Sequence, residues 1–98
     1  MIKPFVDFPG GSVIRYEDEE TANLIYLEED GTYRQASMGK FDGMQASREG
    51  VWKWGKLGSH HAELKLDEDV WRLSFVDFSS AMAYSETGGR TFAFQFDR

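Results

Sequence analysis

Two adjacent histidines are the residues of this chain with the clearest capacity for chemistry. They lie in the stretch VWKWGKLGSHHAEL, residues 51–64, where His60 and His61 follow Trp52 and Trp54 across a turn that contains glycine. An imidazole can bind a metal ion or exchange a proton near neutral pH. The stretch therefore fits either a metal or catalytic site or the end of a β-hairpin.

The residues after this turn bear on that choice. Residues 62–66 read Ala-Glu-Leu-Lys-Leu, and successive side chains of a strand point to opposite faces. His60 then has the inward phase of the apolar residues, whereas His61 points to solvent, so the two imidazoles cannot easily share a metal ion. The chain has no other histidine and no cysteine. We therefore expect no metal and no cofactor, with His60 either a hydrogen-bonded rim residue or a ligand-contacting or catalytic one.

The same period of two runs through most of the chain and predicts β-strands. Residues 71–75 and 91–96 alternate apolar and polar side chains, and turn-forming Gly, Asp and Ser residues separate the segments. No window shows a helical stripe, so we expect an all-β protein, folded as a single domain over residues 1–98. The predicted strands cover residues 11–16, 22–28, 32–37, 50–55, 60–66, 70–76, 81–87 and 90–97.

Composition excludes several classes of function. The chain has 98 residues, of which 41% are hydrophobic, which is too apolar for a disordered chain. The net charge of −6 argues against nucleic acid and anionic membranes as partners, because binding to phosphates relies on Lys and Arg. No apolar run approaches the ~20 residues of a membrane span, and the N-terminus has no signal-peptide core. We expect a cytoplasmic protein.

Register arithmetic predicts one continuous apolar face through the last five strands. It assumes a turn at 55–59 and a three-residue loop at 87–89, because a one-residue slip would move every side chain to the other face. Glu86 then shares the inward phase, either as a buried carboxylate or as a strand end near the rim. The expected pairs are Trp54 with His60, Leu66 with Trp71, Leu64 with Leu73, Phe75 with Met82, Leu73 with Tyr84, Tyr84 with Phe92 and Met82 with Phe94.

The first half of the chain shows a less regular pattern. In residues 22–28, Leu24 and Tyr26 alternate with Ile25 and Leu27, so both faces of this strand are partly apolar. A strand of this kind is usually covered twice. The second cover is either the N-terminal segment with Phe5 and Phe8 or another subunit, which would make the protein a homodimer.

The segment 38–48 is expected to be a loop with three apolar side chains. Met38, Phe41 and Met44 stand there among glycines and polar residues. Such side chains either cap a core or form a lid or a partner-binding surface, since methionine adapts to irregular shapes.

Eight short antiparallel strands are compatible with a closed up-and-down barrel or with two facing sheets. The succession of short strands, the stretch GVWKW at 50–54 and the closing GGRTFAFQF at 88–96 resemble the small calycin barrels, the lipocalin-like group with its compact MoaF-like members. The resemblance implies a small eight-stranded antiparallel up-and-down β-barrel with a ligand-sized cavity and, in many relatives, no catalysis.

Three classes of function remain. The first is a non-catalytic barrel that binds a small apolar or aromatic molecule. The second is an interaction module with a filled interior that forms homo-oligomers, and the third is an isomerase, decarboxylase or hydrolase with His60 or Glu86 as acid or base. The volume of the interior distinguishes them. The candidate ligand-binding residues of the first class are Trp52, Trp54, His60, Trp71, Tyr84 and Phe94.

Overall fold

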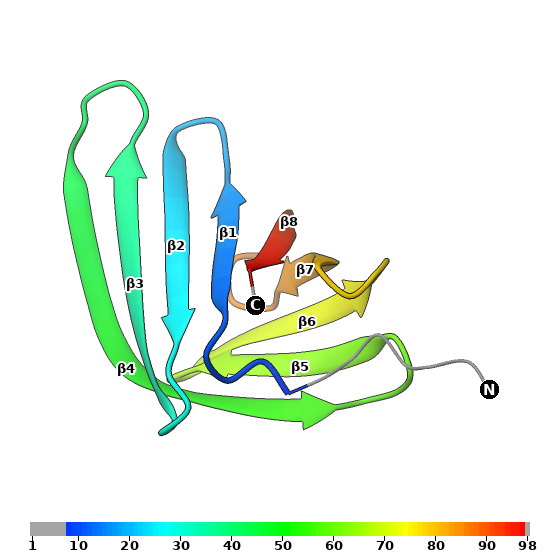
Figure 1. Ribbon diagram of the computed structural model, residues 1–98. Helices are drawn as coiled ribbons and strands as arrows, with labels where there is room; N and C mark the ends of the chain where they lie inside the picture. The colour runs from blue at the N-terminus through cyan, green and yellow to red at the C-terminus, as the bar shows by residue number, and fades with distance from the viewer. Residues whose placement is uncertain (1–7, 98) are drawn as a thin grey trace.

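The computed structural model describes residues 8–97 and forms a closed antiparallel barrel (Figure 1). Each strand pairs with its neighbours in the chain, and the last strand pairs with the first. The predictions of an all-β protein and of a closed up-and-down barrel are both confirmed, and the alternative of two facing sheets is wrong. The strands are β1 (Val13–Glu17), β2 (Thr21–Leu27), β3 (Thr32–Gly39), β4 (Gln45–Lys56), β5 (His61–Leu66), β6 (Asp69–Phe75), β7 (Ser80–Ser85) and β8 (Arg90–Asp97).

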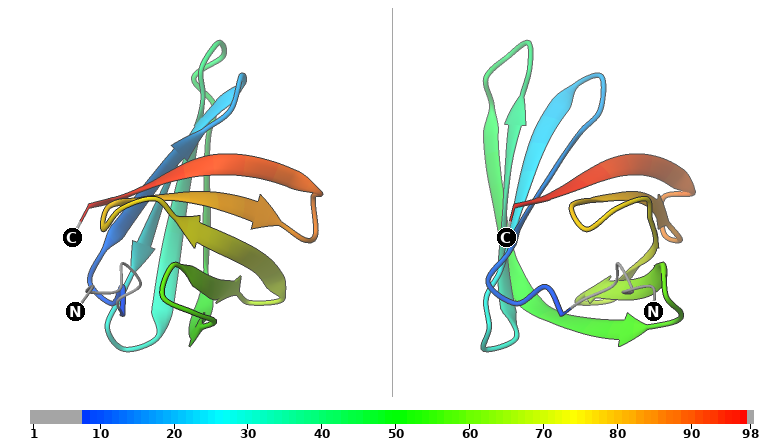
Figure 2. Two further views of the ribbon diagram at one scale, coloured as in Figure 1. Left: turned by 90° about the vertical axis from the view of Figure 1, so that its right-hand side faces the viewer. Right: turned by 45° about the vertical axis from the view of Figure 1, so that its right-hand side comes forward.

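The barrel has two regions of different shape. Strands β5–β8 cross β1–β4 at a large angle, and the upper parts of β1–β4 project beyond them (Figures 1 and 2). Strand β4 belongs to both regions, because residues 45–51 pair with β3 and residues 52–56 pair with β5. The projecting part of β4 thus has a strand on one side only.

The core lies where the two regions meet. Alternate residues of each strand point inward, as the period of two predicts. Trp71, Leu73, Phe75 and Phe94 are buried as expected, and Phe92 is partly buried. The other buried apolar residues include Ile14, Ile25, Leu27, Tyr33, Trp52, Ala62, Leu64, Leu66, Ala81, Ala83 and Phe96.

The predicted loop at 38–48 is wrong in extent. β3 continues to Gly39 and β4 begins at Gln45, so only 40–44 connect them. The segment 45–49 is exposed throughout, so no apolar alternation marks it as a strand, and backbone pairing with β3 alone holds it. The alternative in which the apolar side chains of 38–48 cap the core is also wrong, because Met38, Phe41 and Met44 are exposed.

Two expected registers are wrong by an even number of residues, four between β4 and β5 and two between β5 and β6, which leaves the faces unchanged. Trp54 lies opposite Leu64 rather than His60, and Trp71 lies opposite Leu64 rather than Leu66. The sequence places the β4–β5 turn too early and makes the β5–β6 turn too long. Since a shift by an even number of residues preserves the side-chain phase, the predicted inward residues of β5 and β6 remain inward.

The expected register of β7 is wrong by one residue, and this shift reverses its faces. Phe75 lies opposite Ala81, and Phe92 lies opposite Ala83, because residues 86–89 form a four-residue connection between Ser85 and Arg90. Small inward alanines leave room for the phenylalanines of β8, as tight packing requires. The consequence is that Met82, Tyr84 and Glu86 face outward.

Candidate functional site

The six predicted ligand-binding residues do not form one site. Trp71 and Phe94 lie together in the core, with ring centroids 5.0 Å apart. Tyr84 lies on the outer face of β7 and is 45% exposed. The structure therefore brings together only part of the predicted set.

The two tryptophans of β4 point inward at separate places. The Trp52 indole Nε1 donates a hydrogen bond to the Glu28 carbonyl at 2.9 Å, and its ring lies 5.4 Å from Phe8. Trp54 is half-buried and its ring centroid lies 6.3 Å from that of Phe75. Phe5, the other expected N-terminal cover, lies outside the described residues.

The histidines lie in and beside the turn before β5. His60 is half-buried, and its backbone carbonyl accepts a hydrogen bond from the Phe75 amide at 2.7 Å. His61 begins β5 and is exposed, as expected. Within residues 8–97, no group of three or more His, Asp or Glu side chains is arranged to hold a metal ion.

Aromatic rings occupy the interior between the two regions. Tyr16 of β1 lies 4.9 Å from Phe94, and Phe75 lies 5.2 Å from Phe96 between ring centroids. Separations of 4.5–7 Å are typical of rings in contact. The interior between the two regions is therefore lined by aromatic side chains that contact one another.

Glu86 lies outside the barrel in an ion pair. Its carboxylate accepts a hydrogen bond from the Arg72 guanidinium, and both side chains are substantially exposed. This hydrogen bond raises the pKa of Arg72. Arg72 thus pairs with an acidic residue on the outer surface, and the alternative in which Glu86 is a buried carboxylate is wrong.

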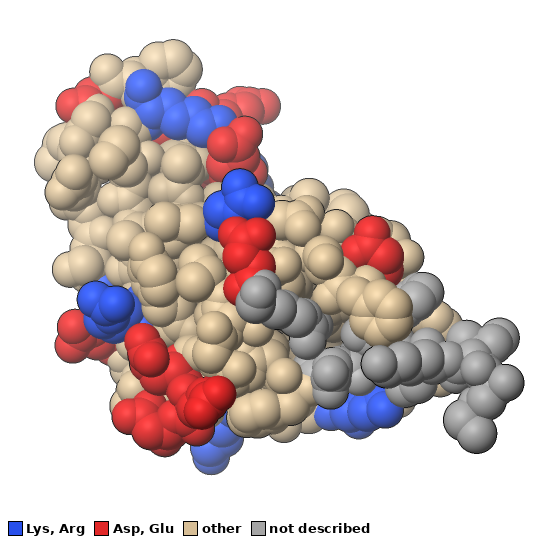
Figure 3. Space-filling view, viewed as in Figure 1, with Lys and Arg blue, Asp and Glu red and all other residues tan. Residues whose placement is uncertain are grey.

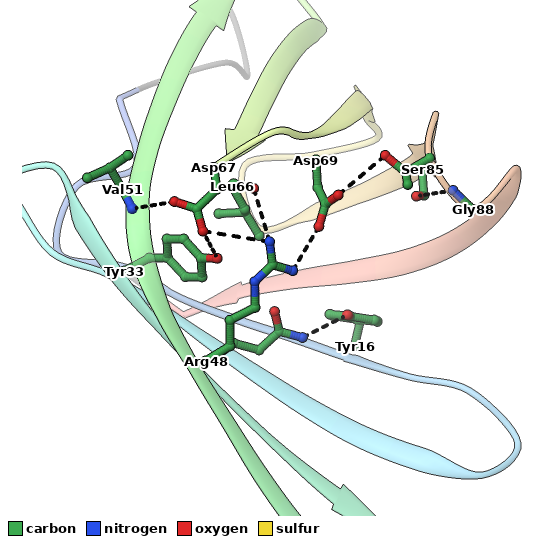
Figure 4. A network of polar contacts seen from close by, with 11 residues as sticks. Tyr16, Tyr33, Arg48, Val51, Leu66, Asp67, Asp69, Ser85 and Gly88 are labelled. Carbon is green, nitrogen blue, oxygen red and sulfur yellow. Dashed lines mark hydrogen bonds and ion pairs between the residues drawn. The ribbon is translucent and has the colours of Figure 1, made fainter.

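A polar cluster that the sequence did not indicate lies where β3 and β4 meet the β5–β6 turn (Figure 4). The Tyr33 hydroxyl donates to the Asp67 carboxylate at 2.8 Å, and the Arg48 guanidinium donates to Asp69 at 2.7 Å. Arg48 also lies 3.6 Å from Asp67. We call Tyr33, Arg48, Asp67 and Asp69 the turn cluster.

The turn cluster shifts the ionisation of its members. Burial and the hydrogen bond to Asp67 raise the pKa of Tyr33 to about 12. Hydrogen bonds from the Val51 amide and the Tyr33 hydroxyl lower the pKa of Asp67. The hydrogen bond to Asp69 raises the pKa of Arg48. Tyr33 is thereby held neutral, whereas Asp67 and Arg48 are held charged.

Gly50 makes room for this arrangement. A Cβ at Gly50 would overlap the Asp67 carboxylate, which folds over β4 from a residue with a φ of 57°. The carboxylate also accepts a hydrogen bond from the Val51 amide at 3.0 Å. The turn cluster therefore fastens the β5–β6 turn to β4, and its one cation is already paired with two carboxylates.

A groove lies on the outer face of β1–β4 and β8. It has a volume of about 940 Å³. Cross-strand pairs such as Leu24 with Ala36 and Ala22 with Met38 place its apolar side chains on this face. Figure 3 shows the same side of the molecule, where uncharged residues cover the upper parts of β2–β4 and charged residues lie mainly at the margins. The apolar second face of β2, noted in the sequence, contributes Leu24 to this groove.

A second groove lies on the outer face of β4–β6. It has a volume of about 590 Å³ and contains Val51 and Val70, with Lys53, Lys65 and the acidic turn residues at its rim. Neither groove is lined by any of the six predicted ligand-binding residues.

Comparison with models of protein families, with curated proteins and with solved structures found no match to this chain. The described residues contain no helix that is long and apolar enough to cross a membrane.

Proposed function

We propose that this protein is a non-catalytic, homo-oligomeric interaction module that acts in the cytoplasm through its outer surface. One observation carries the proposal: aromatic rings in mutual contact occupy the interior, while large apolar side chains stand exposed on the projecting β3–β4 hairpin. Phe41 is 88% exposed and Met44 is 71% exposed at the tip of this hairpin. Exposed apolar clusters of this kind are typical of protein-interaction sites.

The kinship with small calycin barrels is part of the same proposal. The closed eight-stranded antiparallel barrel supports it. The proposal differs from the resemblance in one respect, because aromatic rings contact one another in the interior where the resemblance implies a ligand cavity.

Sedimentation velocity across a wide range of concentrations tests the proposed function. We expect wild-type protein to associate as the concentration rises, and we expect the double variant Phe41→Ser with Met44→Ser to remain monomeric. The matched control is Phe78→Ser, which removes an exposed phenylalanine from the β6–β7 connection. A wild-type protein that stays monomeric up to millimolar concentration would overturn the proposal.

The outer groove supports a second candidate function, the binding of a small apolar molecule. Its volume of about 940 Å³ lies within the ~300–1,000 Å³ of small-molecule sites. Leu24→Glu should lower the affinity for a ligand in this groove, whereas Trp54→Ala should not. A ligand bound in the predicted interior site would instead quench tryptophan fluorescence, and Trp54→Ala would lower its affinity.

A further inference from the structure

The projecting part of β4 ends the sheet with an open edge. Residues 45–50 pair with β3, and no described strand pairs with them on the other side. In Figure 1, β4 forms the outer margin of the upper sheet. An edge of this kind offers backbone N–H and C=O groups to another strand.

The hydrogen bonds at the two ends of this segment show which residues use that edge. Trp52 donates to the Gly31 carbonyl and Gly39 donates to the Met44 carbonyl, so even-numbered residues of β4 bond towards β3. The Val51 carbonyl instead accepts from the Asp67 amide on the opposite side. The backbone groups of Gln45, Ser47 and Glu49 therefore face the open edge.

The open edge lacks two of the devices that commonly prevent strand addition, which are lysine and proline. The segment reads Gln-Ala-Ser-Arg-Glu-Gly, with neither lysine nor proline. The charge of Arg48 is turned to the inner face and paired with Asp67 and Asp69.

The segment can pair with itself without opposing like charges. In an antiparallel pair with its two-fold axis at Ser47, Gln45 faces Glu49 of the second copy and Ala46 faces Arg48 of the second copy. Ser47 with Ser47, and Gln45 with Glu49, would each exchange both backbone hydrogen bonds, because the backbone groups of these residues face the open edge. Alignments that place Arg48 opposite Arg48, or Glu49 opposite Glu49, would oppose like charges, which destabilises a sheet.

The same alignment positions the hairpin tips. Met44 would lie opposite Gly50 of the second copy, at the end of the open edge, because the Asp67 amide already bonds to the Val51 carbonyl. The exposed hairpin tip, with Phe41 and Met44, would thus lie beside the β5–β6 turn of the second copy, whose Asp67 carboxylate lies over Gly50. The two-fold symmetry repeats each contact, as in an isologous dimer.

We propose that two copies of this chain pair through the open edge of β4, with the two-fold axis at Ser47 and each hairpin tip beside the β5–β6 turn of the other copy. This inference rests on the proposed function and specifies the surface through which the module associates with itself.

A proline at position 47 tests the edge. The Ser47 amide points away from β3, so Ser47→Pro removes a donor from the edge and leaves the β3–β4 ladder intact. We expect the dimer dissociation constant to rise roughly ten- to a hundredfold, because backbone hydrogen bonds are lost at the centre of a symmetric interface. The matched control is Ala93→Pro, in the part of β8 that pairs with β7 and not with β1, which is expected to leave the dimer unchanged.

Cysteine crosslinking tests the register. Because the chain has no native cysteine, any disulfide that forms must involve the introduced residue. Ser47→Cys places two thiols on opposite strands with Cα atoms about 5.5 Å apart, within disulfide range. We expect a disulfide-linked dimer on mild oxidation. Glu49→Cys, whose counterpart is Gln45, and the exposed control Ser74→Cys should give none.

The outcomes separate the two proposals. A wild-type protein that never associates would overturn the proposed function. A dimer that survives Ser47→Pro, or that is crosslinked by Glu49→Cys and not by Ser47→Cys, would overturn the β4 edge while leaving self-association in place. Dissociation by Ala93→Pro alone would assign the interface to β8.

Discussion

Strands β5–β8 and the projecting parts of β2–β4 use their two faces in opposite ways. In β5 and β6 the inward side chains are apolar and the outward ones are mostly polar. In the projecting region, Asn23 and Ser37 point inward, whereas Leu24 and Ala36 point outward into the groove. Alternation identifies a strand in both regions. What lies above each face decides which side chains are buried.

The inner face of the projecting region can be polar because its groups bond to one another. The Ser37 hydroxyl donates to the Asn23 carbonyl oxygen at 2.6 Å, and the Gln35 amide donates to the Tyr16 hydroxyl at 3.2 Å. Hydrogen-bonded polar groups avoid most of the cost of desolvation. In strands β5–β8, which we call the packed region, contacts between aromatic rings stabilise the fold instead. Mutations should therefore lower the free energy of unfolding by different amounts in the two regions.

The largest expected effect is that of Phe94→Ala in the packed region. Phe94 is 1% exposed, so its removal should lower the free energy of unfolding by about 3–5 kcal/mol through lost burial and a cavity. Chemical denaturation measures the change. A midpoint close to that of wild type would show that the interior is not the main source of stability.

A smaller effect is expected for Tyr33→Phe, which removes one hydroxyl from the turn cluster. Loss of its hydrogen bond to Asp67 should cost about 1 kcal/mol. Tyr26→Phe, on the outer face of β2, is the matched control and should change little. Equal effects of the two variants would indicate that the turn cluster does not fasten the two regions.

The contribution of Tyr33 should also depend on pH. Its pKa is raised from 10.0 to about 12, so the folded protein favours the neutral phenol. The stabilisation is fully present below the unfolded-state value and is lost as the pH rises through the folded-state value. The stability difference between wild type and Tyr33→Phe should therefore narrow between those two values. A difference that is constant across that interval would contradict this assignment.

Gly50→Ala should displace the Asp67 carboxylate and lower the pKa of Tyr33 towards its ordinary value. Absorbance titration of tyrosinate measures this change. Gly55→Ala on the same strand is the control, because an added Cβ there would lie 4.0 Å from its nearest neighbour, an ordinary contact. An unchanged titration in Gly50→Ala would show that Asp67 does not control the ionisation of Tyr33.

The smallest effect is expected at the tip of the projecting hairpin. Phe41→Ala should change the free energy of unfolding of the monomer by no more than about 0.5 kcal/mol, because the Phe41 side chain is almost fully exposed. Thermal unfolding at low concentration measures this. A large loss would mean that Phe41 packs within its own chain.

Turn chemistry limited how far the sequence alone could define the registers. The length of the 86–89 connection decided whether Tyr84 or Ala83 faced inward, and glycine pairs are compatible with more than one loop length. The turn cluster was not predictable, because Arg48 and Asp67 lie far apart in the chain and each resembles an ordinary surface charge. Gly50 beside Trp52 was visible in the sequence, but its role depends on a carboxylate from another strand.

The sequence by itself determined the all-β class and most of the inward set from Ala62 to Phe75, because a period of two records one buried face. Only the tertiary structure decided the facing of β7, the length of β4 and the location of the open edge. Those features depend on how strands far apart in the chain are joined and covered. No local pattern encodes these features, because the same alternation is compatible with a strand that buries either of its two faces.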